Sequence, residues 1–355
     1  MTYPLKMRTS TKIQCVCYGL LILALYYKPY LVYVLLQIVM VGGMVVGLYQ
    51  KNTNLMCKSK KSLFGRTAIV TGGTTGMGLE IAADFAHRGA KVIIACPFKD
   101  EGLHAKKLIE RSSGSDKIIF KLLDLSSFTS IRRFVADILE TEDRLDLLIN
   151  NAGVGVPDDF LTADGLPFII QVNYFGTFLL TVLLLPLLKK TGAPSEPSRI
   201  VNTASILHKF GKVDFEKWHK IDNNYSKMRK YGTSKLALVM FTRELSVRLK
   251  DSNVIVNVVD PGAVGTAIFK SSGRNWGTFF AFMIGILFKH PWEGAQTALY
   301  VSLSSTVGKM SGKYFKNLKV ALPAAAANNE EVSKRLWDET VNLVKLKDEE
   351  LRCIS

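Results

Sequence analysis

Residues 67–88 read as a strand, a glycine-rich turn and a helix, and this succession constrains the fold more than any other part of the chain. Residues 67–70 predict a buried strand and residues 79–88 a helix. Between them stand Gly72, Gly76 and Gly78, which allow a tight turn and a close backbone approach, so that a pyrophosphate can lie on the helix N-terminus. Such glycines also occur in ordinary turns. The strand and helix around them supply the context that a dinucleotide-binding turn requires.

The same alternation continues along the chain. Further strands are predicted at residues 91–95, 118–122, 145–149 and 199–205. Because helical stretches separate them, the sequence predicts an α/β protein with a Rossmann-type, doubly wound parallel sheet. Ligands of such sheets bind at the carboxyl ends of the strands, where Gly72, Asp124 and Asn151 fall. Ser205 ends the last of these strands and is expected at the same edge.

The end of the second strand bears on the choice of cofactor. NAD-selective sites usually place an acidic residue there for the ribose 2′-hydroxyl. This chain has none at that point, and Asp100 follows only several residues later, where it could equally be a solvated loop residue. Lys99 could approach a 2′-phosphate or simply lie in water. The sequence therefore predicts a preference for NADP(H), with NAD(H) possible.

Tyr231 and Lys235 are four residues apart, so on a helix they share a face. A free tyrosine has a pKa of about 10, too high for efficient proton exchange at neutral pH. A nearby lysine cation favours the phenolate and lowers that pKa. The pair therefore predicts an acid/base for an alcohol oxygen, although a surface helix can carry the same spacing without any function.

Composition narrows the possible partners. The chain has 355 residues, 48% of them hydrophobic, and a formal charge of +16, which suits phosphate-bearing ligands or an anionic membrane surface. No basic stretch is interleaved with aromatic residues as in a nucleic-acid-binding module, so no nucleic-acid partner is expected. The five cysteines show neither metal-ligand spacing nor a disulfide framework, which fits a reducing, cytosol-facing domain without a metal.

Residues 30–49 carry no charge and are long enough to cross a bilayer as a helix. A second uncharged run, residues 13–27, permits either a helical hairpin or a single span. A buried core helix and a cleaved signal peptide are the alternatives, but no small-residue cleavage site is evident. We expect a membrane anchor at residues 1–50, a basic linker at 51–65 and a catalytic domain at 66–355. Lysines and arginines after the apolar run favour a cytosolic catalytic domain.

Five ordered motifs give the region 66–320 a family resemblance. It is similar to the short-chain dehydrogenase/reductase family. The matching residues are Thr71-Gly72-x-x-x-Gly76-x-Gly78, Asn150-Asn151-Ala152-Gly153, Ser205, Tyr231-x-x-x-Lys235 and Pro261-Gly262.

Within that family, the chain resembles the membrane-anchored branch that holds retinol dehydrogenases and the polyprenol dehydrogenase. The motifs that indicate this branch are Asp124-Leu-Ser, Ser234-Lys-Leu-Ala-Leu, Asp260-Pro-Gly262, Ser311-Gly-Lys-Tyr-Phe315 and Arg335-Leu-Trp337. Gly73 leans toward the polyprenol side, where retinol-type relatives usually have Ala. Pro97 replaces an Arg that relatives often carry, which leaves the NADP preference less secure. Ala204 replaces a frequent serine before the catalytic one.

The resemblance implies a role for each matching catalytic residue. Tyr231 would exchange the proton with the substrate oxygen, and Ser205 would hydrogen-bond that oxygen. Lys235 would lower the Tyr231 pKa and hold the nicotinamide ribose, while Asn173 would help to position Lys235 through water. The implied cofactor contacts are Thr71, Gly72, Thr75, Gly76, Met77, Gly78, Lys99, Asp124, Leu125, Asn151, Ala152, Gly153, Tyr231, Lys235, Pro261, Gly262 and Thr266.

The resemblance also implies a lipophilic alcohol or carbonyl as the substrate, with retinoids and polyprenols ahead of steroids. Residues 276–288 are apolar and fit either a buried helix or a substrate lid that touches the membrane. The implied location is a membrane such as the endoplasmic reticulum, with the catalytic domain in the cytosol. A catalytically idle dinucleotide-binding scaffold is the alternative from another class. The sequence leaves the oligomeric state open.

Overall fold

The computed structural model describes residues 53–155, 158–221, 227–264 and 288–351, together with separate helical positions between 30 and 49. Several expected features lie outside these residues. They are the apolar run 13–27, part of the run 30–49, Thr266 and nearly all of the lid candidate 276–288.

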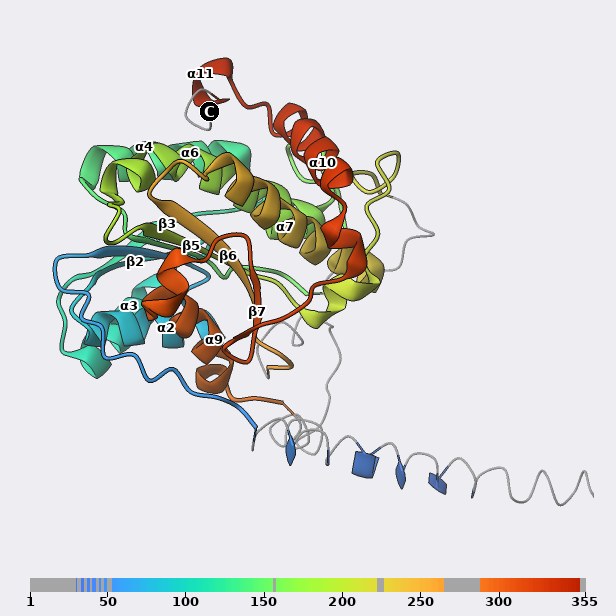
Figure 1. Ribbon diagram of the computed structural model, residues 1–355, viewed down its shortest axis with the longest axis horizontal. Coiled ribbons are helices and arrows are strands. Elements are labelled where there is room, and N and C mark those ends of the chain that lie inside the picture. The colour runs from blue at the N-terminus through green and yellow to red at the C-terminus, as the bar shows by residue number, and fades with distance from the viewer. Residues whose placement is uncertain are drawn as a thin grey trace, which may run out of the picture.

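An eight-stranded sheet in the order β3-β2-β1-β4-β5-β6-β7-β8 forms the centre of the molecule (Figure 1). All neighbouring strands pair in parallel except β7 and β8, which are antiparallel. The strands are β1 Thr67–Thr71, β2 Lys91–Cys96, β3 Ile118–Leu122, β4 Leu147–Asn150, β5 Ser198–Thr203, β6 Val254–Asp260, β7 Tyr314–Lys316 and β8 Lys319–Val320. The predicted doubly wound sheet is confirmed, and each predicted strand matches an observed one to within about two residues at either end.

Helices cover both faces of the sheet. The helices α2 (Gly76–His87), α3 (Lys99–Ser113) and α9 (Pro291–Leu303) lie on one face, and α4 (Phe128–Thr141), α6 (Gly176–Thr191) and α7 (Lys227–Arg248) lie on the other (Figure 1). Two hydrophobic clusters fill the interfaces. Ile69 points into the cluster under α4, α6 and α7, whereas its neighbours Ala68 and Val70 point into the other. Because both faces are buried, the strands are apolar at nearly every position.

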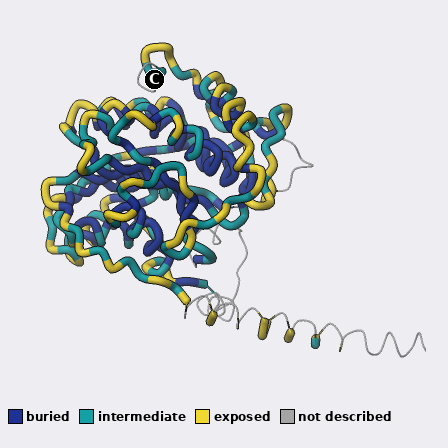
Figure 2. The backbone as a smooth tube through the Cα atoms, viewed as in Figure 1, coloured by how far each residue is buried: buried dark blue, intermediate teal, exposed yellow. Residues whose placement is uncertain are grey.

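Shorter elements complete the chain. The helix α10 (Glu330–Leu343) packs on α7, and α11 (Asp348–Leu351) follows it. The remaining elements are α5 (Phe168–Ile170), the π-turn η1 (Gln171–Phe175) and the 3₁₀ turns η2 (Ile206–Phe210), η4 (Thr306–Lys309) and η5 (Ala325–Asn328). Figure 2 shows that burial concentrates in the sheet and in the inner sides of these helices.

Within the described residues, one helical run is long and apolar enough to cross a membrane. It is Phe168–Thr191, and 89% of its most apolar window is buried inside the protein, so it is a core helix. The expected anchor is a different segment. Its described positions are helical, and the side chains of Ile38, Val45 and Leu48 are at least half exposed within the described part of the structure.

The stretch expected to be a linker lies along the domain surface (Figure 1). The Cys57 amide donates to Gln296 Oε1 at 3.0 Å, and Arg88 Nη1 donates to the Ser59 carbonyl at 2.8 Å. Leu63 is only 2% exposed. From residue 53 onward this stretch is therefore attached to the domain and does not form a free tether.

Candidate active site

Tyr231 and Lys235 lie one turn apart on α7, and both side chains are buried. The Lys235 Nζ lies 5.8 Å from the centre of the Tyr231 ring. The helix therefore brings the two side chains together as their spacing predicts. Lys235 Nζ donates a hydrogen bond to the Thr203 carbonyl at 2.9 Å, at the end of β5.

Ser205 comes directly after β5 and caps the short turn η2, where its Oγ accepts from the Leu207 amide at 3.3 Å. Its side chain is also close enough to the Tyr231 hydroxyl to lower the pKa of that group. The strand end and the first turns of α7 thus place a serine, a tyrosine and a lysine around one point at the carboxyl edge of the sheet. This edge is where an open parallel sheet binds its ligands.

Burial sets the charge states of this group. It raises the pKa of the Tyr231 hydroxyl above its ordinary value, against the hydrogen bond from Ser205 and together with the nearby Asp260 carboxylate. It also lowers the pKa of Lys235 from 10.5 to about 8. The direction is opposite to the lowered Tyr231 pKa expected from the sequence, and desolvation of the phenolate is its largest cause.

Asn173 lies in the π-turn η1, a departure from regular helix of a kind often found at functional sites. Its Nδ2 donates to the Val154 carbonyl at 2.9 Å and to Ser234 Oγ at 3.1 Å, and its Oδ1 accepts from the Val154 amide at 2.8 Å. A Cβ on Gly153 would lie 3.2 Å from both Asn173 Oδ1 and Lys235 Nζ. The amide and the ammonium therefore flank the same glycine.

The glycine turn after β1 is closely packed. Gly72 has φ +62°, and a Cβ there would meet the Ala152 Cα at 2.9 Å. A Cβ on Gly78 would lie 2.1 Å from the Gly72 carbonyl oxygen. Asn151 Nδ2 donates to the carbonyls of Thr71 and Gly72, both at 3.3 Å. Only glycine fits at 72 and 78, and Asn151 holds the turn from the neighbouring strand.

Gly73 has a packing explanation of its own. A Cβ at this position would come within 2.9 Å of Ile94 Cγ2, so the side chain of the neighbouring strand takes the space that an alanine would need. Gly73 is therefore a poor indicator of the substrate.

A cavity of about 340 Å³ opens between this turn and the ends of β2, β3 and β4. The predicted residues that line it are Thr71, Gly72, Thr75, Asp124, Leu125, Ala152 and Gly153. The helix α2 begins beside it without a side-chain cap on Thr75, which leaves the first amides of the helix for an anionic ligand. These features fit the pyrophosphate and ribose of a dinucleotide.

Other predicted cofactor residues are not among those that line this cavity. Gly76, Met77, Gly78 and Asn151 form or support the turn, and Pro261 and Gly262 follow β6 at the same sheet edge. Lys99 is the first residue of α3 and is exposed.

Sequence reasoning missed several residues of the site. The most consequential is Glu101, which lines the cavity from the first turn of α3. Its charge contributes to the raised pKa of the neighbouring Cys96, which is caused mainly by burial. Thr74, Ser126 and Phe168 also line the cavity. The sequence signal that could have identified Glu101 is the start of a helix directly after the strand. On a helix, residues two apart such as Lys99 and Glu101 point to different sides.

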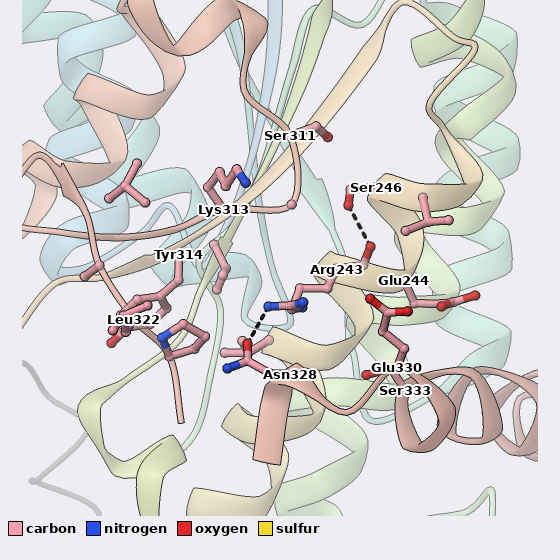
Figure 3. A pocket seen from close by; sticks show the side chains of 17 residues that line it. Arg243, Glu244, Ser246, Ser311, Lys313, Tyr314, Leu322, Asn328, Glu330 and Ser333 are labelled. Carbon is pink, nitrogen blue, oxygen red and sulfur yellow. Dashed lines mark hydrogen bonds between the residues drawn. The ribbon is translucent and has the colours of Figure 1, made fainter. Parts of the chain in front are cut away.

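A second hollow, of about 320 Å³, lies between α7, α10 and the β7–β8 edge (Figure 3). Arg243 and Asn328 face each other across it and share a hydrogen bond of 2.5 Å. None of the predicted site residues lines this hollow. Tyr314 connects it to the site, because its hydroxyl donates to the buried Asp260 carboxylate at 2.8 Å.

Comparisons with known proteins agree with this geometry. The family model described as short chain dehydrogenase matches residues 66–276. The chain is 40% identical to retinol dehydrogenase 13 of Homo sapiens, over 88% of this chain and 94% of the relative. It is 41% identical to retinol dehydrogenase 11 of Mus musculus, over 82% and 90%.

Solved structures with a similar fold include two complexes with a nicotinamide cofactor. The Pseudomonas aeruginosa RhlG/NADP active-site complex is 26% identical with a TM-score of 0.57, and 72% of this chain and 95% of that one are covered. The 3-ketoacyl-(acyl-carrier-protein) reductase from Brucella melitensis complexed with NADH is 25% identical with a TM-score of 0.56, over 72% and 97%. The family match and the relatives together confirm the resemblance drawn from the motifs: this chain belongs to the short-chain dehydrogenase family, among relatives of the retinol dehydrogenases.

Proposed function

We propose that this chain is a nicotinamide-dependent oxidoreductase that interconverts a lipophilic alcohol and its carbonyl, with Tyr231 as the acid/base. The observation that carries the proposal is the meeting of Ser205, Tyr231 and Lys235 at the sheet edge that also holds the glycine-turn cavity. The relatives named retinol dehydrogenases support a retinoid as the first substrate to test, with polyprenols next and steroids behind them.

The residues divide the work as follows. A nicotinamide cofactor, when bound, supplies or accepts the hydride. Tyr231 gives its proton to the carbonyl oxygen in reduction and takes it back in oxidation, and Ser205 donates a hydrogen bond to the same oxygen. The raised Tyr231 pKa keeps the hydroxyl protonated at neutral pH, which is the form that reduction requires. Lys235 offers a buried cation that stabilises the phenolate left behind.

The glycine turn and the residues next to it bind the cofactor in this proposal. Thr75, Gly76 and Met77 open α2 and present the amides that suit a pyrophosphate. Asp124, Leu125, Ala152 and Gly153 line the cavity beyond them. Lys235 and Asn173 flank Gly153. We assign Lys235 to binding the nicotinamide ribose and Asn173 to positioning Lys235. Pro261, Gly262 and Thr266 belong to the loop after β6 and are assigned to the nicotinamide end.

The charges of the residues that line the cavity bear on whether NADP(H) or NAD(H) binds more tightly. Among the described residues, no cation lines the cavity, and Lys99 is exposed outside it, while Glu101 contributes a carboxylate. A carboxylate repels a 2′-phosphate and accepts a hydrogen bond from a 2′-hydroxyl. The sequence predicts that the enzyme prefers NADP(H). We propose that this preference for NADP(H) over NAD(H) is weak and that the enzyme also uses NAD(H) measurably.

Glu101→Gln is expected to improve NADP(H) binding relative to NAD(H) by roughly two- to fivefold, the size of an exposed charge interaction. Pro97→Arg should add a bidentate phosphate partner and increase the ratio by about tenfold. Lys99→Ala serves as the control and should change nothing, because Lys99 does not line the cavity. Cofactor dissociation constants measured by protein fluorescence check this. A large NADP(H) loss in Lys99→Ala would restore that lysine as the phosphate contact.

The anchor belongs to the same proposal. Residues 30–49 carry no charge, their described positions are helical, and the apolar side chains at Ile38, Val45 and Leu48 are exposed. Apolar helix surface of this extent requires a nonpolar environment. We propose a membrane-anchored enzyme whose catalytic domain faces the cytosol, with the endoplasmic reticulum as the first compartment to examine.

An activity screen tests the proposed function. Purified full-length protein in detergent is assayed with NADPH and NADH against retinal, a polyprenal and a steroid ketone, followed by loss of cofactor absorbance. Turnover of at least one lipophilic carbonyl is expected. Cofactor binding without turnover of any of them would contradict the proposal and favour an idle dinucleotide-binding scaffold.

A further inference from the structure

The apolar run of the expected anchor ends close to the folded domain. The Thr53 amide and its hydroxyl both donate to the Tyr49 carbonyl, at 3.0 and 2.7 Å. Thr53 therefore satisfies the carbonyl of the last residue of that run. The residues that follow are already hydrogen-bonded to the catalytic domain. The last residue of the run is thus hydrogen-bonded to Thr53, and Leu55 and Cys57 are hydrogen-bonded to the catalytic domain.

Asn317 holds this junction. Its Nδ2 donates to the Thr53 carbonyl and its Oδ1 accepts from the Leu55 amide, both at 2.9 Å. Asn317 and Leu318 form the two-residue turn between β7 and β8, and both have positive φ, 48° and 62°. A turn of this type favours Asn-Gly, so the leucine is strained there. Through its side chain, Asn317 hydrogen-bonds the backbone of residues 53–55. We call this contact the Asn317 clasp.

The clasp lies at the carboxyl edge of the sheet. Lys316 pairs with Asp260, the residue before Pro261 and Gly262, so Asn317 sits beside the loop assigned to the nicotinamide. On the other side of that loop, Lys289 donates from its amide to the Ala263 carbonyl at 2.8 Å and from its Nζ to Asn54 Oδ1 at 2.7 Å. Residues 53–55 are therefore bonded to both flanks of the loop after β6.

Charge at the clasp indicates what this edge faces. Lys316 and Lys319 stand directly opposite each other across the β7–β8 ladder, and both are exposed. Like charges in this arrangement repel and lower stability. An anionic lipid surface would reverse that effect, because it attracts exposed lysines close to a membrane anchor.

We propose that the Asn317 clasp fixes the sheet edge carrying the active site against the anionic bilayer in which residues 30–49 are anchored, so that substrate enters from the lipid. The proposal rests on the proposed function. A freely tethered domain would expose the same site to water, and a lipophilic substrate would have to leave the bilayer before binding. The clasp removes that step by keeping the two surfaces together, which acts on substrate capture and leaves the chemistry unchanged.

Asn317→Gly and Leu318→Gly form a matched pair. Both place glycine at a positive-φ position, but only the first removes the two hydrogen bonds to residues 53–55. Full-length protein is reconstituted in vesicles of phosphatidylcholine and phosphatidylserine and assayed with retinal, which partitions into the lipid, and with hexanal, which is water-soluble. Asn317→Gly should lower kcat/KM for retinal by roughly fivefold, the equivalent of about one neutral hydrogen bond. Its hexanal kinetics and both activities of Leu318→Gly should match the parent.

Hydrogen exchange at the Leu55 amide gives a readout that is independent of turnover. It should quicken in Asn317→Gly and stay slow in Leu318→Gly. Equal exchange in the two variants, equal retinal kinetics, or a parallel loss with hexanal would overturn the clasp. Absence of turnover with either aldehyde in the parent protein, together with the expected exchange difference, would instead contradict the proposed function.

Discussion

Tyr231→Phe is expected to reduce turnover by about 10²- to 10⁴-fold, the usual contribution of a positioned acid/base. The substitution removes one oxygen and its proton and leaves the ring in place. Lys235 keeps its bond to the Thr203 carbonyl, and the glycine-turn cavity is untouched, so cofactor affinity should be retained. Steady-state kinetics with retinal and a separate cofactor titration measure the two effects.

Tyr174→Phe is the matched control. Tyr174 is fully buried, and its hydroxyl shares a hydrogen bond of 2.8 Å with Thr340 Oγ1, away from Ser205 and Lys235. Losing that bond should cost about 1 kcal/mol of unfolding free energy and leave kcat unchanged. Near-normal turnover in Tyr231→Phe would refute the assigned acid/base. A similar loss of turnover in both variants would mean that the effect is on stability.

The sequence predicts the sheet well because its signals are local. Each of the first five strands is a short apolar run bounded by turn residues, and burial on both faces makes that pattern strong. Tyr231 and Lys235 share a helix, so their spacing alone brings them together. Ser205 and Asn173 come from other elements, and only the order of motifs along the chain connected them to α7.

The parts that the sequence did not predict depend on three-dimensional surroundings. The Tyr231 pKa was expected to fall because a lysine is nearby, but the depth of burial, which has no local signature, raises it. Lys99 was placed in the site because it follows β2, yet α3 begins at that residue and brings Glu101 to the cavity in its place. Residues 53–65 looked like a polar linker because their partners, such as Gln296 and Asn317, are distant in sequence.

Lys235→Met is expected to abolish activity and, unusually for a buried position, to raise stability. Burial lowers the Lys235 pKa from 10.5 to about 8, which corresponds to about 3 kcal/mol of cost for keeping the cation at neutral pH. Methionine removes that cost. It also removes the hydrogen bond to the Thr203 carbonyl, which offsets about 1 kcal/mol. A net gain of roughly 1–2 kcal/mol in unfolding free energy should remain.

Lys230→Met on the same helix should have the opposite sign. Lys230 Nζ lies 2.8 Å from Asp159 Oδ2, with both side chains nearly fully buried, so the substitution would leave an unpaired buried carboxylate. Breaking such a pair typically costs about 3–5 kcal/mol. The two methionine variants therefore distinguish Lys235, whose buried charge lowers stability, from Lys230, whose charge is paired with Asp159. Urea unfolding of both variants measures the two changes in unfolding free energy.

The pH dependence of this stability gain provides a stricter test of the Lys235 charge. Because the folded pKa is below the unfolded one, the cost of the cation is complete below pH 8 and declines as the folded protein loses the proton. The advantage of Lys235→Met over the parent should therefore be largest at pH 7, shrink between pH 8 and 10.5, and give way above that range to a deficit of about 1 kcal/mol from the lost hydrogen bond to Thr203. Other groups titrate alike in both proteins and cancel in the difference. An advantage that stays constant with pH, or a methionine variant less stable than the parent at pH 7, would show that Lys235 is held as a neutral amine or is better compensated than its surroundings indicate.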